Sequence, residues 1–203
     1  MRYQTLGLGC LMLVSSAGAT KEHSAPHLFV HLCDASGLNS AVVRTMKQEV
    51  GKVLGSPDLA IRWSDGCPVF ETRPLPPKVR VYVLRRLPER MRRRLELFKG
   101  SAPLAWFGRY RESPQAMIYV SRGAVETKLS LPKGNEASDR LGRALGRVLA
   151  HELAHYYLGH RHARDGLLKR QLSVSDLQGP ISKDLFLTGE QRNMLLAFAE
   201  NRP

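Results

Sequence analysis

The sequence lacks the features that mark membrane, fibrous and disulfide-rich proteins. After residue 20, no run approaches the ~20 apolar residues of a membrane-spanning helix. Glycine (17) and proline (12) are scattered and not periodic, which excludes a collagen-like chain, and cysteine occurs only three times. Acidic residues are also few, 18 against 31 Lys and Arg, so the formal charge is +13. With 43% hydrophobic residues among 203, a basic globular protein is expected.

The first 19 residues have the composition of a secretory signal peptide. Arg2 gives a positive start, residues 6–14 are mostly apolar, and Ala17-Gly18-Ala19 supplies a small-residue exit. We therefore expect cleavage near Ala19, a single mature domain over residues 20–203 without a transmembrane segment, and a secreted or periplasmic location.

Export would leave two cysteines in the mature chain, Cys33 and Cys67. Disulfides persist in oxidising compartments, so an even pair favours a bond between them. The alternative is two independent buried thiols, because free cysteine is often buried.

Hydrophobic periodicity predicts a leading strand, helix and second strand. Residues 27–32 form a short apolar-rich run, and residues 39–54 place valine, methionine and leucine at helical spacing, with Asn39 or Ser40 as cap and Gly55 as stop. A second strand is expected over residues 59–63. A right-handed crossover would make the two strands parallel, with Cys33 and Cys67 at the same end.

The rest of the chain predicts further strands followed by helices, which is an α+β order. A proline-rich connection (68–77) precedes a half-exposed strand (78–84). An arginine-rich segment (residues 85–94, with six arginines) is expected on a short helix that continues to residue 98. The remaining expectations are strands at 104–107 and 116–120, a loop at 121–135, a strong helix at 138–157 and a last helix at 188–200.

Four of the seven histidines lie within residues 151–162. On a helix, His151 and His155 are one turn apart on the same face, so both imidazoles can reach one metal ion. Glu152 stands beside them, where it can contact a metal-bound water. Zinc suits this set, because a catalytic zinc site has three protein ligands and one open position.

The third ligand must come from beyond the helix. A positive φ at Gly159 would end the helix and turn the chain back beneath the metal. His160 follows this turn immediately, whereas His162 leaves two spacer residues; His162 is the preferred ligand, and His160 could replace or join it.

These residues resemble the zincin metallopeptidases. The trailing glycine and His162 look like the metzincin pattern H-E-x-x-H-x-x-G-x-x-H, with three residues in place of two between His155 and Gly159. The chain is also similar to uncharacterised secreted bacterial zincin-like proteins. The resemblance implies a mixed twisted sheet ahead of the metal helix, a final helix after it, and Leu168 where metzincins place a methionine turn.

The resemblance further implies an antiparallel edge strand that holds an extended substrate. We nominate residues 116–120 for it, and residues 104–107 as the second choice. If the chain follows an aspartate- or glutamate-type zincin, Asp165 or Glu190 would be the third ligand.

The activity implied is zinc-dependent peptide hydrolysis, with Glu152 as general base. The expected partner is a peptide or protein substrate; the arginine-rich segment could add anionic surfaces, whereas nucleic acid is disfavoured because no aromatics are interleaved there. The alternative is a non-catalytic basic binding protein with a structural metal site.

Overall fold

The computed structural model describes residues 26–56, 58–67, 79–89, 91, 93, 104–109, 116–131, 135–159 and 162–200. The expected signal peptide (1–19), the proline-rich connection (68–77) and His160 lie outside these residues. None of the described helices is both long and apolar enough to cross a membrane.

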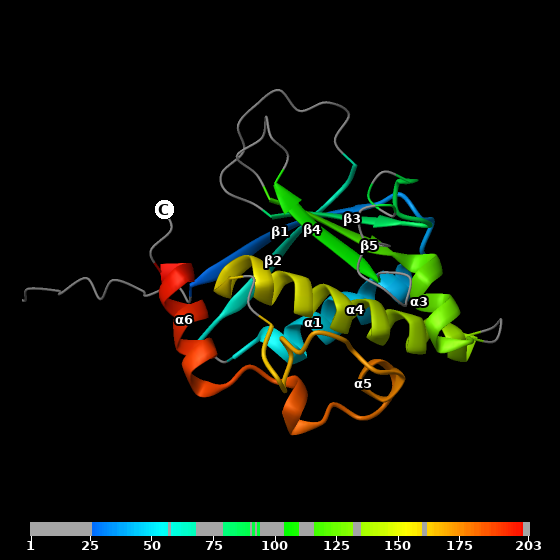
Figure 1. Ribbon diagram of the computed structural model, residues 1–203. Helices are drawn as coiled ribbons and strands as arrows, with labels where there is room; N and C mark the ends of the chain where they lie inside the picture. The colour runs from blue at the N-terminus through cyan, green and yellow to red at the C-terminus, as the bar shows by residue number, and fades with distance from the viewer. Residues whose placement is uncertain are drawn as a thin grey trace, which may run out of the picture.

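A mixed five-stranded sheet forms one layer of the fold, and the structure is therefore α+β (Figure 1). Its strands are β1 (His27–Asp34), β2 (Ala60–Asp65), β3 (Val79–Leu84), β4 (Ala105–Arg109) and β5 (Ala116–Ser121). The order across the sheet is β2-β1-β3-β5-β4. The first four strands in this order run parallel to one another, and β4 pairs antiparallel with β5 at one edge.

The leading strand, helix and strand are confirmed. Helix α1 (Ser40–Leu54) connects β1 to β2, and the Asn39 side chain caps it by accepting the Val42 N–H at 2.9 Å. The parallel register sets Leu32 opposite Asp65, so the chain ends that follow β1 and β2 lie together. The predicted disulfide between Cys33 and Cys67 forms there.

Helix α4 (Asn135–Leu158) lies against α1, and both lie alongside the sheet in Figure 1. Two glycines allow the close approach. A Cβ at Gly142 would come within 2.7 Å of the Thr45 side chain, and one at Gly146 within 2.6 Å of the Glu49 side chain. Larger residues at these positions would push α4 away from α1, so the two glycines determine how closely α4 packs against α1.

A buried ion pair joins the same two helices. The side chains of Arg147 and Glu49 are each only 1% exposed, and Arg147 Nε donates to Glu49 Oε1 at 2.7 Å. Arg147 also donates to the backbone carbonyls of Asp176 and Gly179, at 2.6 and 2.8 Å. One side chain of α4 therefore fixes both α1 and the chain around α5 (Val174–Gln178).

The final part of the chain contains a short 3-10 helix, η1 (Lys183–Leu185), and α6 (Gly189–Glu200). The expected last helix is thus present. Of the arginine-rich segment the structure describes residues 85–89, 91 and 93, where Leu87 and Met91 are buried and Arg85 and Arg86 are exposed.

Two expectations are wrong. Residues 121–135 are not a loop throughout, because α3 (Arg122–Leu129) begins there; Ser121 caps it, and Val125 and Leu129 are its buried residues. Residues 116–120 are not an edge strand, because β5 pairs with β3 on one side and β4 on the other. The antiparallel edge is β4, which contains most of the second-choice residues 104–107.

Candidate metal centre

The last turns of α4 bring two histidine rings together. The side chains of His151 and His155 leave the same face of the helix, and the residues are 8% and 6% exposed. Their Nε2 atoms lie 3.0 Å apart. The two buried imidazole rings therefore direct their Nε2 atoms toward each other.

The other ring nitrogens are held by backbone carbonyls. His151 Nδ1 donates to the Leu167 carbonyl at 2.6 Å, and His155 Nδ1 donates to the Gly159 carbonyl at 3.2 Å. A carbonyl can only accept, so each Nδ1 carries a proton and, in the neutral ring, each Nε2 is a lone-pair acceptor. Two such acceptors 3.0 Å apart could share one cation, either a proton or a metal ion.

Burial keeps His151 neutral. Desolvation lowers the pKa of His151 to about 4; the Leu167 hydrogen bond opposes this shift, and the positive charges that His155 and His162 would carry add to it. A neutral ring is the form that binds zinc.

Gly159 turns the chain so that a third histidine reaches the pair. Its φ is +101°, a left-handed conformation that favours glycine, and its N–H bonds to the His155 carbonyl at 3.0 Å. His162 follows and remains exposed. One ring nitrogen from each of His151, His155 and His162 lies within 4.8 Å of the others, so these three residues could hold a metal.

A turn over residues 163–169 contacts the first of these histidines through the Leu167 carbonyl. The Ala163 N–H donates to the Leu168 carbonyl at 2.9 Å, and Gly166 takes a positive φ of +87°. Leu167 and Leu168 are buried, 1% and 5% exposed. The turn thus presents the Leu167 carbonyl to His151, a contact that the sequence motif does not contain.

Glu152 is half-buried on α4 next to the first histidine. Desolvation raises the pKa of Glu152 to about 7. A carboxyl group with a pKa near neutrality can both accept and release a proton at neutral pH, as a general base and acid must.

The structure does not group the two alternative ligands with the histidines. Asp165 is exposed on the turn, 3.9 Å from Arg164, and Glu190 is exposed in the first turn of α6. Neither belongs to the group of residues that could hold a metal.

The three nitrogens fit zinc in kind, and the His151–His155 pair nearly fits it in spacing. With Zn–N distances of about 2.0–2.1 Å, two ligands of a tetrahedral ion are roughly 3.3 Å apart. The His151–His155 separation of 3.0 Å is close to this value, and all three nitrogens lie within 4.8 Å of one another. Backbone acceptors on the distal nitrogens are the usual support of metal-binding histidines.

The edge strand β4 lies beside this end of α4. The ring centroids of Phe107 on β4 and Tyr156 on α4 are 6.0 Å apart. Tyr156 stands one turn after Glu152 on the helix. The antiparallel edge and the helix that carries the histidines are therefore neighbours in space.

No family model and no curated protein matches the chain. Among solved structures, it is similar to a zinc-dependent peptidase from Methanocorpusculum labreanum, with a TM-score of 0.50 and 14% identity over 82% of this chain and 99% of that one. At this identity the likeness shows a shared fold. The chain thus has the fold of a zinc-dependent peptidase and a histidine cluster that could hold a metal.

Proposed function

We propose that this protein is a zinc-dependent endopeptidase that binds its metal through His151, His155 and His162. The observation that carries the proposal is the pair of facing Nε2 atoms, 3.0 Å apart, whose rings are already committed to backbone acceptors on the other side. The fold shared with a zinc-dependent peptidase supports it.

Zinc, when bound, would polarise a water molecule and the scissile carbonyl and lower the pKa of that water from about 15.7 toward 7. Glu152, as the carboxylate, accepts a proton from the water. The protonated Glu152 then donates this proton to the leaving amine. Its raised pKa suits it to both steps.

An extended substrate would pair with the edge strand β4. Among the described residues β4 pairs only with β5, and its Phe107 side chain lies near Tyr156 on the metal helix. Backbone pairing at such an edge positions a peptide without requiring a particular sequence.

We place the mature protein, residues 20–203, outside the cytoplasm. The Cys33–Cys67 disulfide fits an oxidising compartment, and the signal-like residues 1–19 provide a route there. The exposed arginines that begin the arginine-rich segment would face anionic surfaces.

The test combines metal content with cleavage of a mixed peptide library. The purified protein should contain one zinc per chain and cleave peptides, and a chelator should abolish cleavage. Glu152→Gln should keep the zinc and lose roughly 10²–10⁴-fold in turnover, because the proton acceptor is removed while the ligands stay. His151→Ala should lose the metal itself.

Glu190→Gln is the matched control, since this exposed carboxylate on α6 does not belong to the group that could hold a metal. It should leave both zinc and turnover unchanged. Bound zinc without any cleavage would contradict the peptidase and favour a binding protein with a structural metal. Full activity in Glu152→Gln would show that Glu152 takes no part in the reaction.

A further inference from the structure

The turn over residues 163–169 must be held in one place for its Leu167 carbonyl to orient the His151 ring. The Ala163 N–H and the Lys169 N–H donate to carbonyls within the turn, at 2.9 and 3.3 Å. These bonds shape the turn but do not tie it to the rest of the molecule. The two leucines of the turn are buried, but apolar packing is not directional and does not by itself aim a carbonyl at one ring nitrogen.

Lys169 supplies a directional tie. Its Nζ lies 2.6 Å from Oδ2 of Asp176, and the two side chains are 26% and 13% exposed. Water and salt screen such a partly buried pair less than an exposed one. Among the described basic residues of 163–170, Arg164 and Arg170 are exposed, so only Lys169 is partly buried.

Asp176 is in turn fixed to α4 and to its own short helix. Its backbone carbonyl accepts a bond from Arg147 Nη1 at 2.6 Å. Its carboxylate accepts the Ser173 N–H at 2.6 Å, as part of the capping box of α5. Lys169 therefore binds an acceptor whose main chain is already held by α4.

These contacts form a closed path that starts and ends on α4. Arg147 and His151 are four residues apart, about one turn of the helix. Between them the path runs through the carbonyl and carboxylate of Asp176, the ammonium of Lys169 and the carbonyl of Leu167. Within this path the Lys169–Asp176 bond joins the turn to α5, so its loss would let the turn shift against the His151 ring.

We propose that Lys169 and Asp176 are positioning residues for the histidine cluster. Their ion pair holds the turn so that the Leu167 carbonyl accepts from His151 Nδ1 and leaves Nε2 directed at His155. This inference rests on the proposed function, because it assigns the orientation of the ring to the binding of zinc. A ring that is oriented before the metal arrives binds it more tightly, since less ordering is needed on binding.

The first test measures the His151 ring without metal. In ¹⁵N-labelled protein kept with a chelator at neutral pH, NMR measures how fast the Nδ1 proton exchanges with solvent. The exchange should be slow in the wild type, because this proton is bonded to a buried carbonyl. Lys169→Met removes the ammonium and should speed the exchange by roughly threefold or more. Lys169→Arg keeps a charged donor and should restore slow exchange.

The second test measures metal binding. Zinc affinity from chelator competition should fall about 3–30-fold in Lys169→Met, and the visible absorption bands of the cobalt-substituted protein should shift. Lys169→Arg should match the wild type in both measurements. Asp176→Asn, which keeps an oxygen for the Ser173 cap, is the second variant and should behave as Lys169→Met does.

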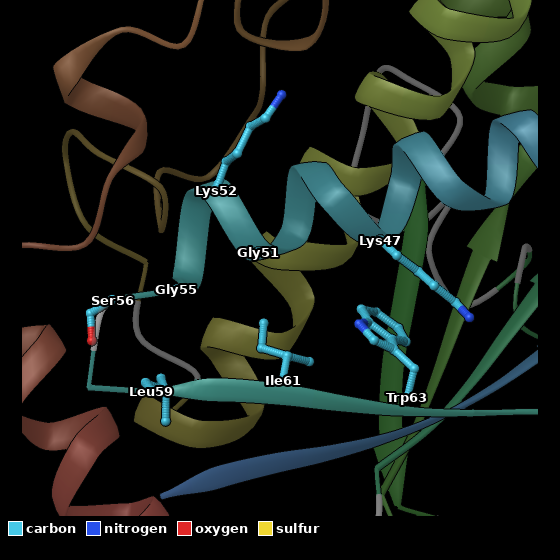
Figure 2. A pocket seen from close by; sticks show the side chains of 8 residues that line it. All are labelled: Lys47, Gly51, Lys52, Gly55, Ser56, Leu59, Ile61 and Trp63. Atoms are coloured by element: carbon cyan, nitrogen blue, oxygen red, sulfur yellow. The ribbon is translucent and has the colours of Figure 1, made fainter. Parts of the chain in front are cut away.

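Lys47→Met is the matched control. Lys47 Nζ lies 2.6 Å from Asp65 and its side chain is 20% exposed, so this ion pair has the same length and its lysine a similar exposure. Figure 2 shows Lys47 beside Trp63 at the hollow between α1 and β2, elements that contain none of the three histidines. Lys47→Met should leave the ring-proton exchange and the zinc affinity unchanged, as should Arg170→Met next to Lys169.

Unchanged ring-proton exchange or unchanged zinc affinity in Lys169→Met would overturn the proposal. So would an equal loss of zinc affinity in Lys47→Met, because general destabilisation would then explain the effect, or a failure of Lys169→Arg to restore binding. Wild-type protein that binds no zinc would contradict the proposed function. The ring-proton exchange, measured without metal, would in that case still decide whether Lys169 positions His151.

Discussion

Breaking the buried pair of Arg147 and Glu49 should destabilise the fold strongly. Glu49→Gln keeps the size of the side chain and removes only its charge. The guanidinium of Arg147 would then remain in a position that is 1% exposed, with an amide where the carboxylate had been at 2.7 Å. Removing one partner of such a pair typically costs about 3–5 kcal/mol, because the other charge stays buried and uncompensated.

Arg147→Met should cost as much, because three acceptors lose their donor. Two of them are the carbonyls of Asp176 and Gly179, and an unsatisfied buried acceptor costs about 1–3 kcal/mol. The third is Glu49, whose second oxygen keeps Lys52 at 3.4 Å as a weak partner. The double variant Arg147→Met with Glu49→Leu should cost no more than Arg147→Met alone, since no unpaired charge remains.

Urea unfolding followed by circular dichroism measures these differences, provided that the slope with denaturant stays constant. Asp139→Asn is the control: its partner Arg143 lies on the same helix, but both side chains are substantially exposed. Such a pair contributes at most about 1 kcal/mol. A loss below about 1 kcal/mol for Glu49→Gln, or strictly additive losses in the double variant, would refute the assigned role of the buried pair.

Three further predictions concern stability and the metal. Replacing Cys33 and Cys67 together by alanine should lower the free energy of unfolding by about 3–4 kcal/mol, from the loop entropy of a 34-residue separation, and a smaller loss in urea titration would argue for residual structure in the unfolded chain. Burial acts to raise the pKa of Asp176, but hydrogen bonds from Lys169 and Ser173 outweigh it and hold that pKa below its usual value. The stability that Asp176 adds is therefore present at neutral pH and lost as the pH falls below about 4. Asp176→Asn should remove this contribution to the pH dependence in unfolding experiments from pH 7 to 2. Gly159→Ala should destabilise the protein by more than about 1 kcal/mol and weaken zinc binding in a chelator competition, because φ is +101° there; unchanged zinc affinity would show that the turn is not needed to place the third histidine.

The sequence predicts the elements with strong periodicity and clear ends. Helix α1 has both, an asparagine cap and a glycine stop, and its crossover to a parallel strand follows from general handedness. Helix α3 has a serine cap, Ser121, but little periodicity: only Val125 and Leu129 are buried over its eight residues, so a single apolar pair carries the whole signal. Helix α5 is five residues long, too short for any period.

The position of a strand within the sheet is a different kind of information. Residues 116–120 and 104–107 are both apolar runs of similar length, and nothing local separates an interior strand from an edge strand. The difference arises because β5 lies between β3 and β4, a pairing between distant segments. The edge was therefore assigned to the wrong run, although the existence of both strands was predicted.

For the candidate site, the sequence could predict which side chains come together but not which backbone groups hold them. The spacing of His151 and His155 requires only that the segment be helical. The carbonyl that orients His151 belongs to Leu167, sixteen residues further on. Every residue has a carbonyl, so no residue type marks this position; only the turn over residues 163–169 brings it to the ring.

The same strip of α4 that bears the histidines also anchors the chain that returns beneath them. Arg147 stands one helical turn before His151, and His151 one turn before His155. Arg147 binds the carbonyls of Asp176 and Gly179, and His151 binds that of Leu167. The returning chain is thus held at two points by consecutive turns of one helix, which in turn is fixed to α1 by glycine contacts and the buried ion pair. The geometry at the histidines consequently depends on residues 163–179 as well as on the histidine motif. If the histidines hold zinc as proposed, we expect substitutions that displace this returning chain to weaken zinc binding without changing a ligand.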